Sequence, residues 1–89
     1  MPLTKANKYK NLTASTNAIK GGPGVLVGMY VNSTSSGTIK LYDSLTQANT
    51  VLNNTITPAV GWHSLGNGAF GVGLSATIGG TLDVTLYYQ

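Results

Sequence analysis

Residues 25–43, VLVGMYVNSTSSGTIKLYD, show the clearest alternation of apolar and polar positions in the chain. Side chains of a β-strand repeat every two residues, and this segment alternates on both sides of an interruption at 32–37. The interruption consists of turn-forming residues, and its Gly37 can supply a positive φ. The return arm places Ile39 and Leu41 inward. The pattern therefore predicts a β-hairpin whose largely apolar first arm is a central strand.

A second hairpin is expected at residues 69–88. Its first arm, residues 69–78, alternates between larger apolar residues and small residues, which indicates close approach of a neighbouring strand or subunit. Gly79 and Gly80 form the expected tight turn. In the second arm, four side chains are expected to point inward: Leu82, Val84, Leu86 and Tyr88.

Weaker strand signals fill most of the remaining chain. Residues 12–20 are expected to form a first edge strand, and residues 50–57 a strand that Pro58 ends, because proline offers no donor to the ladder. A turn is expected at 66–68 (Gly-Asn-Gly). Residues 44–50 fit either a short helical turn or a loop.

Many short strands separated by glycine-rich turns predict an all-β fold. We expect one small antiparallel β-sandwich or jelly-roll-like domain over residues 18–89. Residues 1–17 are polar and basic and are expected to form an extended N-terminal arm. A domain in a chain of 89 residues is marginally stable alone and often gains stability by forming oligomers.

The chain carries few charges. Asp, Glu, Lys and Arg make up 8% of its residues, against roughly 25% in an average protein. A polar but hardly ionic surface is unusual for a freely soluble monomer and suits a protein packed among other proteins. The absence of cysteine excludes a disulfide framework and a cysteine-based zinc site.

The basic residues are concentrated at the N-terminus, with no acid among them. An arm of this kind can bind an acidic protein surface or nucleic acid, or can simply be solvated. Lysines without arginine favour a solvated arm, then an acidic protein surface, and make nucleic acid the least favoured partner. The lysines of the first twenty residues are Lys5, Lys8, Lys10 and Lys20.

One glycine motif matches a nucleotide-binding pattern in its letters. Residues 66–71 read G-N-G-A-F-G, but dinucleotide chemistry needs a helix N-terminus directly after the motif. The residues that follow alternate with a period of two and cannot begin a helix. The glycines are therefore assigned to turns and strand packing, and no cofactor is expected.

Catalytic and metal sites lack the residues that they need. His63 is the only histidine, and Asp43 and Asp83 are the only acids. A metal site usually needs three or four protein ligands, and acid–base or triad catalysis needs partners that this chain does not supply. We therefore expect no enzymatic activity, no catalytic residue and no metal site.

Aromatic residues are the remaining candidates for binding. Trp62 is either a core residue or an interface anchor, since tryptophan is enriched at interface hot spots. Tyr30, Tyr42 and Tyr87 fall on outward strand positions. A row of tyrosines could stack on sugars or cover a partner, although cross-strand pairing explains it as well.

The segments GGPGVLVGMYVNSTSSGTIKLYDSLT and FGVGLSATIGGTLDVTLYY, over roughly residues 18–88, resemble a group of small structural proteins of tailed bacteriophages. The resemblance implies a β-sandwich capsid decoration, cement or head-associated protein, often trimeric. It implies no catalytic residues. The N-terminal lysines lie outside the shared pattern.

Together these observations lead to a functional hypothesis. We expect a non-enzymatic virion protein, made in the host cytoplasm and located on the outer capsid surface, that bridges and stabilises neighbouring major capsid subunits as a homo-oligomer, in particular a trimer. We expect neither a secretory signal nor a membrane span. The alternative is a carbohydrate-binding or host-attachment module of a head fibre or tail. The expected capsid or subunit contacts are Lys5, Lys8, Tyr9, Lys10, Trp62 and His63.

Overall fold

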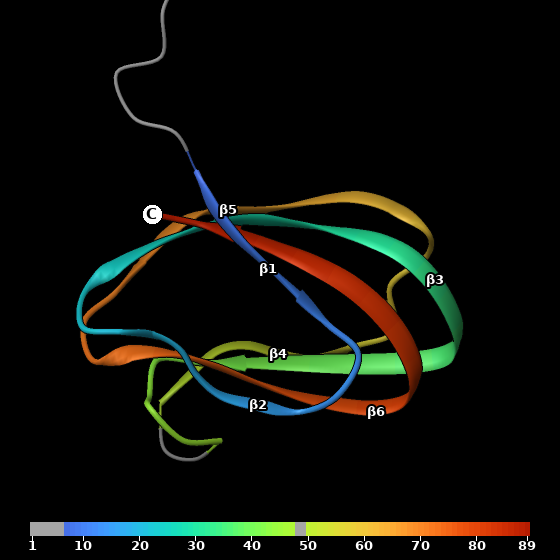
Figure 1. Ribbon diagram of the computed structural model, residues 1–89, viewed down its shortest axis with the longest axis horizontal. Coiled ribbons are helices and arrows are strands. Elements are labelled where there is room, and N and C mark those ends of the chain that lie inside the picture. Colours follow the sequence, from blue (N-terminus) through green and yellow to red (C-terminus); the bar gives the residue numbers. More distant parts are fainter. Residues whose placement is uncertain (1–6, 48–49) are drawn as a thin grey trace, which may run out of the picture.

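The computed structural model describes residues 7–47 and 50–89, which form six strands and no helix (Figure 1). Every pairing between strands is antiparallel and joins them into one sheet, so the expected all-β antiparallel class is confirmed. The strands are β1 (Lys8–Leu12), β2 (Thr16–Gly21), β3 (Gly24–Tyr42), β4 (Val51–Ile56), β5 (Gly61–Phe70) and β6 (Gly73–Tyr88).

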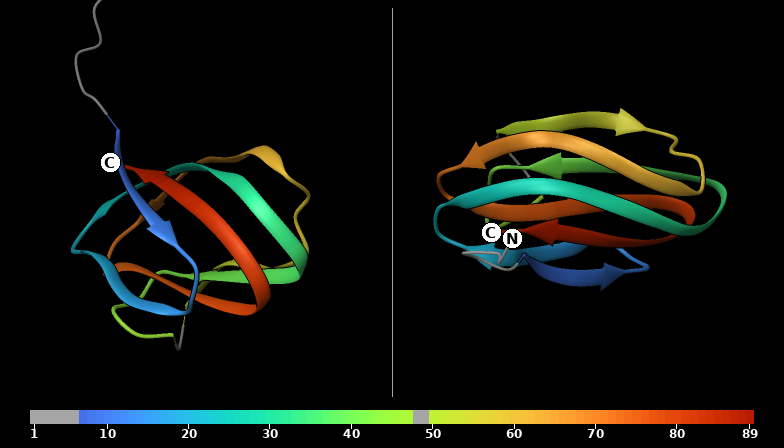
Figure 2. Two further views of the ribbon diagram at one scale, coloured as in Figure 1. Left: turned by 45° about the vertical axis from the view of Figure 1, so that its right-hand side comes forward. Right: turned by 90° about the horizontal axis from the view of Figure 1, so that it is seen from above.

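The two long strands, β3 and β6, pair with each other along most of their length and belong to both ends of the sheet. Near the C-terminus of β6 the strand order is β1–β6–β3–β5, which we call the first half-sheet. Near the N-terminus of β6 the order is β2–β6–β3–β4, which we call the second half-sheet. Figure 2 shows β4 and β5 along one side of the molecule and β1 and β2 along the other, with β3 and β6 between them.

Both predicted hairpins are wrong, because β3 continues through 32–37 and β6 continues through 79–80 without reversing direction. The turn-forming residues of the two strands lie opposite each other and form a shared corner, where both strands curve round the same end of the molecule (Figure 1). Ser36 and Gly80 adopt positive φ angles of 54° and 67° there. Two consecutive residues of β3, ending at Ser36, oppose the single residue Thr81, which is a β-bulge.

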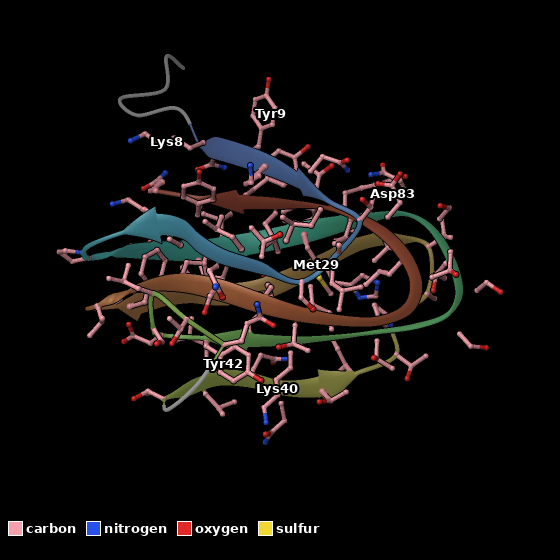
Figure 3. All side chains as sticks on the ribbon, turned by 60° about the horizontal axis from the view of Figure 1, so that its bottom comes forward. Lys8, Tyr9, Met29, Lys40, Tyr42 and Asp83 are labelled. Carbon is pink, nitrogen blue, oxygen red and sulfur yellow. The ribbon has the colours of Figure 1, made fainter. Side chains whose placement is uncertain are left out.

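Side chains from both half-sheets form one hydrophobic cluster. The expected inward positions of β6 and of the end of β3 are confirmed, and burial of this apolar surface is the main stabilising contribution to the fold. Met29 lies within this cluster, between the two outer faces (Figure 3). The fully or nearly buried members include Leu26, Met29, Val31, Ile39, Leu41, Leu74, Ala76, Leu82, Val84 and Leu86.

Several shorter elements differ from the sequence prediction. Residues 12–20 do not form one edge strand, because β1 ends at Leu12 and β2 begins at Thr16. The predicted turn at 66–68 lies inside β5, where Gly66 and Asn67 have positive φ angles and the register against β3 shifts. The strand predicted at 50–57 is confirmed as β4, which ends before Pro58.

The segment predicted as an N-terminal arm includes strand residues. Lys8–Leu12 pairs with the last residues of β6 as β1, at the edge of the first half-sheet. An arm with free backbone groups gains hydrogen bonds by docking on such an edge. Residues 1–6 lie outside the described residues, so that part of the arm stays a prediction.

Candidate functional site

The expected contact residues at the N-terminus lie on both sides of β1. Tyr9 pairs with Tyr87 on the outer face, whereas Lys8 and Lys10 occupy the alternate positions and are exposed because β1 is an edge strand. Figure 3 shows Tyr9 pointing away from the sheet. Lys5 lies outside the described residues.

Trp62 and His63 are neighbours on β5 and therefore point to opposite sides of the sheet. Trp62 is 50% exposed on the outer face. The Nε2 nitrogen of His63 donates a hydrogen bond to the carbonyl oxygen of Ala59 at 2.7 Å, which makes this ring a local brace for the chain that enters β5. The two side chains do not form one contact site.

Tyr87 lies between Tyr9 and Trp62 and contacts both rings. The ring centroid of Tyr87 lies 6.3 Å from that of Tyr9 and 5.6 Å from that of Trp62, both in tilted arrangements. These are favourable separations for aromatic pairs. Tyr30 pairs with Trp62 across β3 and β5 and is also exposed. We call Tyr9, Tyr30, Trp62 and Tyr87 the aromatic face.

Gly28 makes room for this arrangement. A Cβ atom at Gly28 would lie 2.5 Å from Cζ2 and 2.6 Å from Cη2 of Trp62, so the indole ring lies directly over the glycine. Gly28 also pairs with Tyr87 on β6, which places the tryptophan ring beside the Tyr87 ring. The missing side chain in β3 is therefore what allows aromatic residues from β1, β6 and β5 to form a row.

A group of polar side chains lies next to the aromatic face on the same outer surface. One carboxylate oxygen of Asp83 accepts hydrogen bonds from the side-chain amides of Asn11 at 2.7 Å and Asn32 at 3.1 Å. The same two amides approach the hydroxyl of Thr85. The hydrogen bonds from Asn11 and then from Asn32 lower the pKa of Asp83, because they stabilise the ionised form. We call Asn11, Asn32, Asp83 and Thr85 the polar cluster.

The outer face of the first half-sheet is exposed, whereas a loop covers the outer face of the second half-sheet. The loop at 43–47 is fixed to it by hydrogen bonds from Ser75 to the carbonyl of Thr46 and from Thr77 to the side chain of Gln47. Tyr42, predicted at an outward strand position, lies on this face, where the Thr77 hydroxyl donates a hydrogen bond to its hydroxyl, but the loop leaves it only 9% exposed. It lies on the opposite side of the molecule from Tyr9 (Figure 3), so the tyrosines do not form a single row.

Asp43 has a structural role at the start of this loop. Its carboxylate accepts backbone hydrogen bonds from Gly71, Val72 and Gly73 at 2.9, 2.8 and 3.3 Å. These bonds lower the pKa of Asp43, with Gly71 making the largest contribution. The carboxylate thereby fixes the connection from β5 to β6.

The edge formed by β4 differs from the edge formed by β1. Residues 44–82 contain no Asp, Glu, Lys or Arg, and Val51 and Ile56 of β4 are exposed. β4 and β5 both pair with β3 rather than with each other, and a cavity of about 230 Å³ opens beside them. It is lined by Leu26, Leu52, Asn53, Ser64, Leu65 and Gly68.

The described residues offer no set of ligands for a metal ion, since they contain no group of three His, Cys, Asp or Glu side chains. Residues 7–47 and 50–89 contain no helix that is long and apolar enough to cross a membrane. The G-N-G-A-F-G sequence at 66–71 lies in β5 and the turn after it, so no helix N-terminus follows it.

Sequence reasoning missed the way in which the site is assembled. Trp62 and Tyr9 were identified singly, and Tyr87 was placed outward, but Gly28 and the polar cluster were not identified. The register of four strands decides these contacts, and one sequence does not reveal that register.

In comparisons with protein-family models, curated protein sequences and solved structures, nothing matches this chain.

Proposed function

We propose that this protein is a non-enzymatic structural protein of a bacteriophage virion, a decoration or cement protein on the outer capsid surface. We further propose that its curved sheet is a small β-sandwich and that the protein assembles as a trimer. The resemblance of residues 18–88 to small bacteriophage structural proteins supports this proposal.

The observation that carries the proposal is the uncharged edge strand β4. Natural proteins usually protect sheet edges with lysine, proline or bulges, because free backbone groups pair readily with another chain. The β1 edge carries Lys8 and Lys10. The pairing of β4 with β3 has two register shifts, but β4 has no charge and exposes Val51 and Ile56. An uncharged, partly apolar edge is suited to permanent cover by a neighbouring subunit.

The mechanism is passive stabilisation. A protein that binds adjacent capsid subunits only in the assembled shell stabilises that shell by mass action. The β4 edge can add a strand to a neighbouring sheet, and the nearby cavity can accept an apolar side chain. Burial of Val51, Ile56 and the exposed Val60 then adds apolar contact area.

The proposal is tested with virions that lack the protein. We expect the purified chain to rebind such particles at regular sites visible by electron microscopy and to raise the temperature at which they release the genome. A chain that does not bind, or that binds without changing genome release, contradicts the stabilising role.

A further inference from the structure

The aromatic face and the polar cluster lie side by side on the outer surface of the first half-sheet, and we infer that together they form a binding site for a neutral oligosaccharide. This inference goes beyond the proposed role of the β4 edge, which belongs to the second half-sheet. The two surfaces are distinct, so one can bind while the other is occupied.

The aromatic part provides a platform that is fixed before any ligand binds. Tyr87 contacts both Tyr9 and Trp62, and the Trp62 ring rests over Gly28. Tyr9 is 71% exposed and Trp62 is 50% exposed, so their rings are accessible. Aromatic rings of this kind pack against the C–H face of a sugar ring at low cost in conformational entropy, because they are already ordered.

The polar cluster provides acceptors for hydroxyl groups. Since the amide nitrogens of Asn11 and Asn32 both donate to one oxygen of Asp83, their carbonyl oxygens point elsewhere. Within residues 7–47 and 50–89, these two carbonyl oxygens and the second oxygen of Asp83 accept no hydrogen bond. Sugar hydroxyls are donors that suit such a set, and a few fixed polar groups beside aromatic rings are typical of ligand sites.

The spacing along β6 indicates the size of the ligand. Asp83, Thr85 and Tyr87 occupy alternate positions on the outer face, and four residues of strand span about 14 Å at roughly 3.4 Å per residue. A ligand that touches both the polar cluster and the Tyr87 ring therefore extends over more than one sugar ring.

The charge of the site selects neutral sugars. Asp83 is the charged residue of the polar cluster, and the amide hydrogen bonds that lower its pKa keep it ionised at neutral pH. Sialic or uronic acids would place a second negative charge near it without a compensating cation among residues 7–47 and 50–89, since Lys8 and Lys10 alternate with Tyr9 on β1 and point away from the aromatic face.

The test is a titration of the isotope-labelled full chain, followed by NMR, with maltotriose, cellotriose, mannotriose and triacetylchitotriose, and with sialyllactose for comparison. We expect at least one neutral trisaccharide to shift the indole signal of Trp62 and the side-chain amide signals of Asn11 and Asn32. The expected Kd lies at about 0.1–10 mM, as for a shallow exposed site.

Variants connect the response to the site. Trp62→Ala and Asp83→Asn are each expected to weaken binding by about tenfold, which corresponds to about 1.4 kcal/mol, and Val72→Ser, at an exposed residue outside the site, is expected to leave it unchanged. If Trp62→Ala does not fold, Tyr9→Ala at the edge of the face replaces it.

Three outcomes would overturn the inference. The first is no response to any neutral trisaccharide at about 100 mM, roughly tenfold above the upper end of the expected Kd. The second is a preference for sialyllactose, and the third is binding of a polyglutamate peptide in place of the sugars. Each of them leaves the rebinding of the chain to virions unaffected, so this inference and the proposed function fail independently.

Discussion

Trp62 occupies the space that a side chain at Gly28 would fill, since a Cβ atom there would lie 2.5 Å from its ring. We therefore expect Gly28→Ala to displace the indole ring from Tyr87 and to lower the free energy of unfolding by about 1–3 kcal/mol, as overpacking does. Tryptophan fluorescence should shift to the red. Gly68→Ala is the matched control, because its Cβ would come no closer than 3.8 Å to another residue. Unchanged fluorescence in Gly28→Ala would contradict this account.

The β4 edge supplies a prediction about association. Ile56→Lys and Val51→Lys place a charge on this exposed, uncharged strand, and we expect both to abolish binding to virions that lack the protein. Because both side chains are exposed, the melting temperature of the isolated chain should change little. Val72→Lys, another exposed valine, is the control and should bind normally. Normal binding of both β4 variants would show that β4 is not the contact edge.

The two aspartates supply a prediction about pH. The pKa of Asp43 and that of Asp83 are both lowered from an ordinary value of 3.8 by hydrogen bonds present only in the folded chain. Their contribution to stability is therefore fully present above about pH 5 and is lost as the pH falls through 3.8 and below, where the folded carboxylates bind protons.

Urea unfolding at a series of pH values measures this effect. Asp43→Asn should lower stability at neutral pH, since the amide has a single acceptor oxygen and cannot accept from Gly71 as well as from Val72 and Gly73, and should flatten the acid dependence. Asp83→Asn should remove only the part of the acid dependence of stability that Asp43 does not cause. An acid dependence that is the same in wild type and in both variants would contradict the assignment.

The corner shared by β3 and β6 predicts opposite effects at two adjacent positions. A Cβ at Gly37 would lie 2.5 Å from the carbonyl oxygen of Thr81 and 2.7 Å from Cβ of Leu82, so Gly37→Ala should destabilise the fold by about 1–3 kcal/mol. Ser36 has a φ of 54°, and Ser36→Gly should be neutral or stabilising because glycine adopts that angle without strain. Equal losses in both variants, measured by urea unfolding, would contradict this explanation.

The sequence predicted which residues are buried better than it predicted how the chain turns. Alternation identified Leu82, Val84 and Leu86 correctly, because side chains alternate between the two faces of a strand whichever strands pair with it. The segments 32–37 and 79–80 contain turn-forming residues, yet both continue their strands. Positive φ angles occur both where a continuous strand bends at a corner and where a hairpin reverses the chain. Which of the two forms depends on pairing between distant segments.

The candidate site was predictable only in its parts. The sequence identified Tyr9 as part of the basic N-terminal arm, Trp62 from the enrichment of tryptophan at interfaces, and Tyr87 from its outward strand position. Their assembly depends on a bulge in β3 after Leu26, which places Gly28 opposite Tyr87. The burial of Tyr42 was not predictable, because no local signal indicates that the following loop folds back over the second half-sheet.

Because β3 and β6 each belong to both half-sheets, neither half contains a complete set of strands without the other. We therefore expect all-or-none unfolding, with the slowest amide hydrogen exchange in these two strands on both sides of the corner. Their pairing joins residues far apart in the sequence, which makes folding slow for a chain of this length. A proteolytic cut at the corner would release no stable fragment.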